Sequence, residues 1–158
     1  MEEICIRKAM HTDINAMSAL MISSAEKYIA FELTDKCKAK LLASMSTDAL
    51  TQYFTFHYDY YVAIMDEEII GVIGMKDTSH LYHLFVADTF YGRGVARLLW
   101  QVAKENAINF GGLSYFTVNS AITAQEIYKK WGFLPIDGIR TRDGFSDIPM
   151  KLSLPGSH

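Results

Sequence analysis

The sequence predicts an α/β (α+β) domain with a mixed, mostly antiparallel sheet of about seven strands and about four flanking helices. The first reason is the order of the segments, which runs strand, helices, three strands, helix, strand, helix and two strands. The second is that the three central strands follow one another with short turns, as an antiparallel meander does. That meander excludes a strictly alternating, doubly wound fold.

The chain length favours one domain. Its 158 residues contain no repeat, no low-complexity stretch and no Pro/Gly-rich linker. Half of the residues are hydrophobic, which is a globular composition, and a core of this size needs no disulfide or metal. We therefore expect a single domain over residues 1–154, with residues 155–158 as a frayed tail.

Charge and cysteine content exclude several classes of protein. The net charge is −3 and the pI is about 5.9, which argues against a nucleic-acid partner. Cys5 and Cys37 are too few for a disulfide framework or a zinc site, so we expect buried or half-buried reduced thiols. No apolar run reaches the roughly 20 residues of a membrane span, and the acidic N-terminus is unlike a secretion signal. We expect a cytoplasmic protein with no membrane partner.

The N-terminal third predicts one strand and three helices. Glu3–Lys8 alternates between apolar and polar residues, as a strand does. Thr12, Thr34 and Ser46 each precede apolar residues at helical spacing, which predicts three capped helix starts. Lys36, Lys38 and Lys40 are expected on a solvated helix face.

The rest of the chain alternates β-rich runs with two amphipathic helices. A meander is expected first, because two apolar runs are separated only by the acidic turn Asp66–Glu68. Tyr53–Tyr61 is rich in aromatic residues, which fill the core or form one wall of an acceptor pocket. The predicted elements are strands Tyr60–Met65, Ile69–Met75 and His80–Val86, helix Gly92–Phe110, strand Leu113–Val118, a helix from its cap Ser120 to Lys130, and strands Phe133–Arg140 and Ser146–Leu154.

The junction between His80–Val86 and the following helix is the most informative motif. Gly92-Arg93-Gly94 opens the helix, and glycines there let backbone N–H groups point outward with no side chain in the way. The unpaired amides and the helix dipole favour an anion such as a phosphate or pyrophosphate, and Arg93 and Arg97 add charge at the rim. A tight turn without a ligand would use the same glycines. The dinucleotide and Walker fingerprints are both incomplete.

The residues around this turn resemble motif A of the GNAT superfamily of acetyl-CoA-dependent N-acetyltransferases. Leu84-Phe85-Val86 ends the strand, and Tyr91–Ala96 follows the Q/R-x-x-G-x-G/A pattern except that Tyr91 replaces the usual Gln or Arg. Downstream, Asn119, Ala124 and Tyr128–Phe133 are similar to motif B. The resemblance implies a GNAT-like mixed sheet in which a splayed strand pair holds the cofactor.

The resemblance also implies a set of cofactor-binding residues. Backbone groups of Phe85 and Val86 would pair with the pantetheine amides, and one N–H, that of Phe85, would face the thioester oxygen. Amides from Gly92 to Arg97 would hold the pyrophosphate, and Asn119 would bond the pantetheine. The implied set is Leu84, Phe85, Val86, Tyr91, Gly92, Arg93, Gly94, Val95, Ala96, Arg97, Asn119 and Tyr128.

Three residues are candidates for the chemistry. By the resemblance, Tyr128 would be the general acid for the departing thiolate, although a core aromatic residue is the alternative. His80 and Tyr82 stand at the family's positions for a base, on a strand face opposite Leu81 and His83. His80 can also be a polar residue at a strand start, and His83 is expected to be a packed histidine. His57 lines the acceptor side or covers the core.

Two functions follow from the resemblance. The first is direct transfer of the acetyl group of acetyl-CoA to a primary amine of a small molecule or peptide in a ternary complex, with no metal. The second is a catalytically degenerate acyl-CoA-binding sensor or assembly module, which the departure at Tyr91 favours. A homodimer through the edge that ends at Gly144–Met150 is a further expectation. The amine cannot be named from the sequence.

Overall fold

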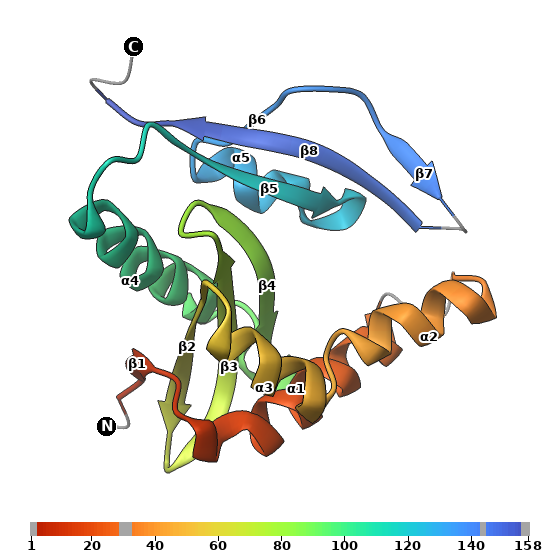
Figure 1. Cartoon of the computed structure of the whole chain (residues 1–158), viewed down its shortest axis with the longest axis vertical. Helices are drawn as coiled ribbons and strands as arrows, with labels where there is room; N and C mark the ends of the chain where they lie inside the picture. The colour runs from red at the N-terminus through yellow and green to blue at the C-terminus, as the bar shows by residue number, and fades with distance from the viewer. Residues whose placement is uncertain (1–2, 29–32, 143–144, 156–158) are drawn as a thin grey trace.

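Eight strands form one mixed sheet in the computed structural model, which describes residues 3–28, 33–142 and 145–155. The strand order is β1-β2-β3-β4-β5-β8-β6, and β7 pairs with β8. Within the described residues every paired couple is antiparallel except β4 and β5. The strands are β1 (Cys5–Lys8), β2 (Tyr58–Met65), β3 (Glu68–Lys76), β4 (His80–Val86), β5 (Tyr115–Ala121), β6 (Leu134–Pro135), β7 (Arg140–Arg142) and β8 (Phe145–Ser153). The predicted fold class is therefore confirmed (Figure 1).

Five α-helices flank this sheet in the described part of the chain. They are α1 (Ile14–Tyr28), α2 (Asp35–Ala43), α3 (Thr47–Thr55), α4 (Val95–Phe110) and α5 (Gln125–Lys130). Two of the predicted caps are confirmed: the Thr34 side chain accepts the N–H of Cys37, and that of Ser46 accepts the N–H of Ala49. None of the described helices has the length and apolar character needed to cross a bilayer.

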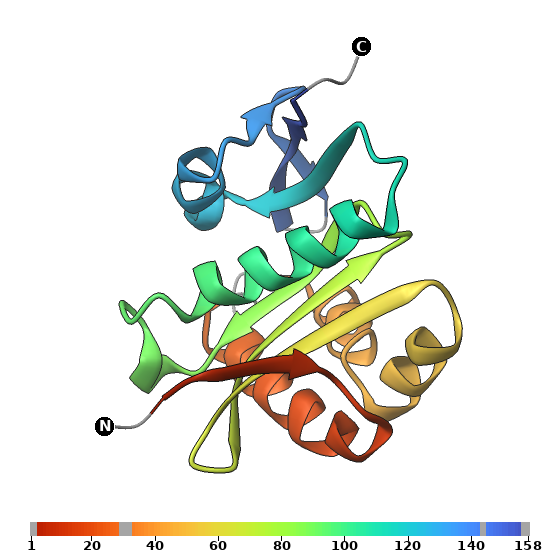
Figure 2. The ribbon, with the colours of Figure 1, turned by 90° about the vertical axis from the view of Figure 1, so that its left-hand side faces the viewer.

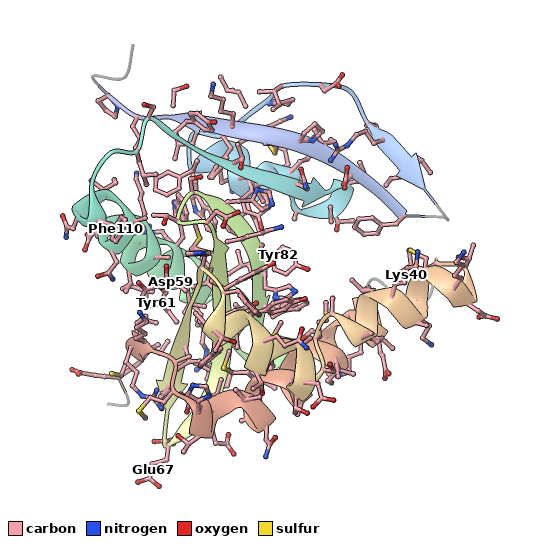
Figure 3. The ribbon with its side chains drawn as sticks, viewed as in Figure 1. Lys40, Asp59, Tyr61, Glu67, Tyr82 and Phe110 are labelled. Atoms are coloured by element: carbon pink, nitrogen blue, oxygen red, sulfur yellow. The ribbon has the colours of Figure 1, made fainter. Side chains whose placement is uncertain are left out.

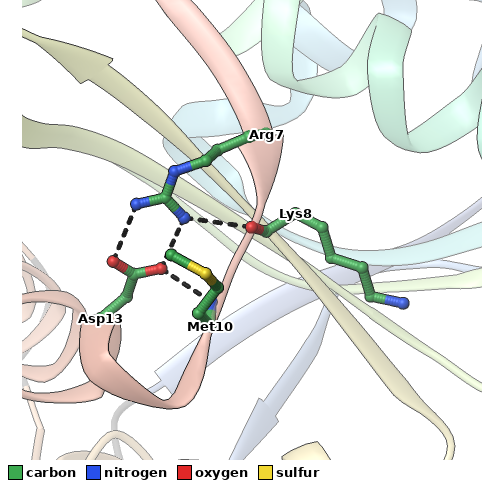
Figure 4. Close-up of polar contacts among 4 residues, drawn as sticks. All are labelled: Arg7, Lys8, Met10 and Asp13. Carbon is green, nitrogen blue, oxygen red and sulfur yellow. Dashed lines mark hydrogen bonds and ion pairs between the residues drawn. The ribbon is translucent and has the colours of Figure 1, made fainter.

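An ion pair fixes the start of α1 against the edge strand β1. The Arg7 guanidinium donates to both carboxylate oxygens of Asp13, at 2.7 and 3.0 Å (Figure 4). The same carboxylate accepts the N–H of Met10 at 2.7 Å, so it also satisfies a free amide ahead of the helix. These bonds hold the pKa of the Asp13 carboxyl below its usual value, with the Arg7 hydrogen bond as the main cause.

Two apolar cores cover the two faces of the sheet. Figure 2 shows α4 against one face of β2, β3 and β4 and α1 against the other. On the α4 face, Leu99 and Trp100 pack with Phe116 and Phe133, so one core runs from β3 across to the C-terminal strands. On the α1 face, Met17 and the other buried residues pack against α3 and β2. Helices thus cover both faces of the sheet at β2, β3 and β4.

The structure differs from the predicted elements near the C-terminus. The single strand expected over Phe133–Arg140 is two short strands, β6 and β7, because a local turn at Asp137-Gly138 interrupts it. Ser120 is not a helix cap: it is buried in β5 opposite Ile148, and α5 begins only at Gln125. Cys5 is exposed rather than buried, because β1 lies at the edge of the sheet.

Candidate active site

The parallel strands β4 and β5 part from each other after a short contact. They pair only at His80 with Thr117 and Leu81 with Val118, and then diverge (Figure 1). A cleft of about 650 Å³ opens along the unpaired edge of β4 and reaches the start of α4. The other walls come from helices α1, α2 and α5, from β5 and from the first residue of β8. The splay leaves backbone groups of β4 free for a ligand, because no strand pairs with them on this side.

A β-bulge decides which side chains of β4 face the cleft. Gly74 of β3 pairs with His83 and the next residue of β3 pairs with Leu81, so Tyr82 is the extra residue in β4. Tyr82 and His83 consequently lie on the same face, where both rings contact Tyr53. The prediction that they lie on opposite faces is wrong, because strict alternation does not hold across a bulge.

His83 is held in place by a row of three residues across β2, β3 and β4. The Tyr60 hydroxyl lies 2.8 Å from Nδ1 of His83, and Gly74 stands between them in the register. A Cβ atom on Gly74 would collide with the Tyr60 ring, so the glycine makes this crossing possible. His83 is only 6% exposed, which confirms the expected packed histidine, and burial lowers its pKa to about 3. His83 is among the residues that line the cleft, and its ring is uncharged at neutral pH.

The glycine turn at the start of α4 borders the same cleft. Gly92 and Gly94 have φ of 78° and 77°, in the left-handed region that favours glycine, and Gly94 is the N-cap of α4. A Cβ atom on either glycine would meet nothing within 4 Å, so the backbone there is open to a ligand. Tyr91 also borders the cleft, whereas Arg93 and Arg97 are exposed and lie outside its lining. The turn therefore presents amides rather than guanidinium groups.

Tyr128 and Asn119 face the cleft from its other side. Tyr128 is 7% exposed and its ring packs on Trp131 and Phe133. Among the described residues its hydroxyl has no hydrogen-bond partner, and burial raises its pKa. Asn119 accepts a hydrogen bond from Arg140 through Oδ1, which leaves its side-chain N–H group for a ligand carbonyl. Both residues suggested by the motif resemblance thus present a donor to the cleft.

Two other predicted residues lie elsewhere. His80 is at the closed end of the splay, where Nδ1 lies 2.8 Å from the Thr117 hydroxyl oxygen, and it does not line the cleft. Burial, and to a smaller extent the charge of Lys76, lowers the pKa of His80. His57 is exposed and lines a different cavity, which contradicts a place on the acceptor side of this cleft.

That second cavity, of about 670 Å³, lies at the opposite end of α4. Figure 3 labels Asp59, Tyr61 and Phe110 from its lining on one side of the molecule, while Tyr82 lies on the other side of the sheet. None of the residues of the two motifs borders it. The aromatic run Tyr53–Tyr61 packs mainly into the core. Tyr60 is 2% exposed, and Tyr53, Phe54 and Tyr58 pack on the same cluster.

Comparison with known proteins identifies the family. Residues 15–154 match the model of the acetyltransferase (GNAT) domain. The chain belongs to this family. No curated protein matches the sequence.

Solved GNAT structures share the fold at low sequence identity. The GCN5-related N-acetyltransferase from Rhodopseudomonas palustris is 19% identical, with a TM-score of 0.81 and coverage of 98% of both chains. The PaiA N-acetyltransferase from Thermoplasma acidophilum, solved in complex with coenzyme A, is 17% identical with a TM-score of 0.81, over 96% of this chain and 99% of that one. Ard1 from Thermoplasma volcanium is 13% identical with a TM-score of 0.73, over 96% and 97%.

Proposed function

We propose that this GNAT protein transfers the acetyl group of acetyl-CoA to a primary amine of a small molecule or peptide, by direct attack in a ternary complex. The observation that carries the proposal is the gap between β4 and β5, which leads from the glycine turn to the unpaired hydroxyl of Tyr128. Family membership supports acyl transfer, and a relative solved with coenzyme A supports the choice of donor.

The residues along the gap fit two parts of coenzyme A, the pyrophosphate and the pantetheine. Amides from Gly92 to Arg97 would take the pyrophosphate, because they start α4 and have open space before them. Backbone groups of Leu84 and Val86, which point away from β3, would pair with the pantetheine amides in place of a neighbouring strand. Asn119 would donate to a pantetheine carbonyl from the opposite side.

The reaction forms a C–N bond between the amine and the acetyl carbon and breaks the C–S bond of the thioester. The register with β3 directs the N–H of Phe85 towards Val72, so an N–H of Leu84 or Val86 on the open edge would donate to the carbonyl oxygen as it gains negative charge. Such a donor contributes about 3 kcal/mol at comparable sites. Tyr128 would donate its proton to the departing sulfur. Burial raises the pKa of Tyr128, so its hydroxyl stays protonated at neutral pH and is available as a donor while negative charge develops on the sulfur.

The amine proton needs another route. His80 lies outside the cleft lining, and His83, with a pKa of about 3, is too weak a base for an alkylammonium. We propose that water in the open cleft takes this proton and that the Tyr82 hydroxyl orients the amine. Because the described lining of the cleft holds no basic side chain except His83, turnover should rise with pH towards the pKa of the amine.

The experiment measures acetyl-CoA-dependent thiol release over a panel of amines, after calorimetry with coenzyme A and acetyl-CoA. Transfer predicts release that requires an amine, together with an acetylated product of matching mass. Binding of acetyl-CoA without release across polyamines, amino sugars, arylalkylamines and peptides would support the sensor or assembly module instead. Absence of binding would contradict both functions.

A further inference from the structure

One end of the cleft is formed by side chains that the cofactor-binding residues do not include. On its helical side this end is lined by Ser24 of α1, Leu41 of α2 and Met45 of the loop after α2. On its sheet side it is lined by Tyr82 and His83 of β4. We call these five residues the acceptor wall. Under the proposed function, the pantetheine occupies the gap beside β5, so the acceptor wall is the surface left for the amine.

No charged side chain borders the cleft within the described residues. Two carboxylates close in sequence to lining residues are already paired: Asp88 with Lys27 at 2.9 Å, and Asp147 with Arg140 at 3.0 Å. The acidic turn after β2 is remote, as the position of Glu67 at the far end of the molecule shows (Figure 3). A second ammonium group on the acceptor would therefore find no free carboxylate among the described lining residues.

The polar atoms of the acceptor wall are neutral and available. Ser24 is 7% exposed, and its hydroxyl has no hydrogen-bond partner in the described part of the chain. His83 uses only Nδ1, with Tyr60, and Tyr82 makes a single long contact of 3.5 Å with the Tyr53 hydroxyl. Among the described residues, every side-chain N or O atom that is fully buried has a hydrogen-bond partner. Since the Ser24 hydroxyl has none, it must be accessible to solvent or to a ligand.

Apolar surface makes up the rest of the acceptor wall. Leu41, Tyr82 and Phe85 are half-buried and line the cleft, whereas Met45 is only 2% exposed and adds little surface. Such a surface gains free energy by covering apolar groups, about 25 cal/mol for each Å² removed from water. It offers nothing to a hydrated cation, whose transfer out of water without a partner is costly.

Resting on the proposed function, we propose that the acceptor is a monoamine: its reacting nitrogen is its only charge, and it carries an apolar or aromatic body with an uncharged hydrogen-bonding group. The body packs on Leu41, Tyr82 and Phe85, and the uncharged group bonds to Ser24 or His83. Polyamines and aminoglycosides are then poor acceptors.

The test compares two amines of equal heavy-atom number, hexylamine and cadaverine, which differ in one charge. Purified protein with saturating acetyl-CoA is assayed for thiol release with each, and with tyramine and spermidine as a second pair. We expect kcat/KM at least about tenfold higher for the monoamine of each pair, because the second ammonium loses its hydration without a partner.

A substitution provides an internal check. Ser44→Asp places a carboxylate on the lining next to Met45 and should narrow the preference for hexylamine by about tenfold. Ser23→Asp adds the same charge at an exposed position of α1 outside the lining, and should leave the ratio unchanged. Calorimetry with coenzyme A verifies that both variants still fold and bind.

The outcomes separate this inference from the function on which it rests. Equal or better turnover of cadaverine and spermidine overturns the monoamine class while leaving acetyl transfer intact. If none of the amines of either kind gives thiol release, acetyl transfer is overturned, and the monoamine class is overturned with it. An equal shift of the ratio in both serine variants would assign the preference to overall charge rather than to the acceptor wall, which also overturns the inference.

Discussion

The two edges of β4 differ in how completely they are paired. Towards β3, the strand is bonded along its length, from Lys76 opposite His80 to Gly71 opposite Val86, with one bulge. Towards β5, it is bonded at two positions and then borders a cleft. One strand is thus a structural element on one side and a binding surface on the other.

This difference separates rigidity from access. The closed edge fixes His83 through Tyr60 and Gly74, and bonds to β3 hold the backbone of Phe85 straight. The open edge can then present peptide groups to a ligand without losing its shape, because β3 already satisfies half of the hydrogen bonds of the strand. Substitutions on the open edge should alter binding and turnover, and those on the closed edge should alter stability.

The largest effect is expected from Tyr128→Phe in α5, which faces the open edge from the other side of the cleft. The change removes the hydroxyl that faces the cleft and keeps the ring that packs on Trp131 and Phe133. Loss of a general acid lowers kcat by about 100-fold, while affinity for coenzyme A stays within about twofold. Steady-state kinetics and calorimetry measure both. Tyr115→Phe, at an exposed position outside the cleft, is the control, and unchanged kcat in Tyr128→Phe would remove this residue from the mechanism.

Gly74→Ala should break the closed edge. Its Cβ atom would overlap the Tyr60 ring, which must move and lose its bond to His83. We expect the free energy of unfolding to fall by about 2 kcal/mol, a usual cost of overpacking a core. Urea denaturation measures it, with Gly138→Ala as a control, because a Cβ atom there meets nothing within 4 Å. Equal stability of the two variants would contradict the role assigned to Gly74.

Gly94→Ala is compared with Gly112→Ala, which changes a glycine of similar backbone conformation far from the cleft. Gly112 has a φ of 79° and, like Gly94, open space around its Cβ position, but it follows the other end of α4. Each alanine in the left-handed region costs about 1 kcal/mol of stability. Only Gly94→Ala should also raise the Kd for coenzyme A, by about tenfold, because its methyl group enters the cleft. Calorimetry decides, and parallel losses of affinity would argue against a phosphate site at this turn.

The smallest effect is expected at the ion pair between Arg7 and Asp13, which lies at the β1 edge of the sheet. Arg7→Gln should lower the free energy of unfolding by about 1 kcal/mol at neutral pH. The pKa of Asp13 is lowered in the folded chain, so the pair stabilises fully above the unfolded value of 3.8 and loses its effect as the pH falls through the folded pKa. Urea titrations at several pH values test this. Lys8→Gln, which breaks an exposed pair at 3.4 Å, should change little at any pH.

Features that depend on neighbouring residues in the chain could be predicted from the sequence. The glycine turn is one, because a left-handed backbone at a helix start calls for glycine wherever it occurs. The caps Thr34 and Ser46 are others, because each bonds an amide three residues away. The strand His80–Val86 has the expected bounds for the same reason.

Features that depend on tertiary neighbours could not be predicted. The bulge at Tyr82 exists only in the pairing with β3, so alternation along β4 gave the wrong face for His83. Gly74 and Tyr60 acquire their roles from each other and from β4, and neither carries a local signal. Ser24 reads as an ordinary helical serine until α1 is placed over the cleft.

The short contact between β4 and β5 also bears on how the chain folds. The meander β2–β3–β4 closes through tight turns, so its ladders form between residues close in sequence. The parallel pair β4–β5 can form only after the long segment through α4 has closed, which costs chain entropy. Only two residue pairs of the ladder offset that cost. We therefore expect β5 to join the sheet late in folding. Packing of Phe116 of β5 on Trp100 of α4, rather than backbone pairing, would hold it there. The binding cleft would then be the last part of the native structure to form.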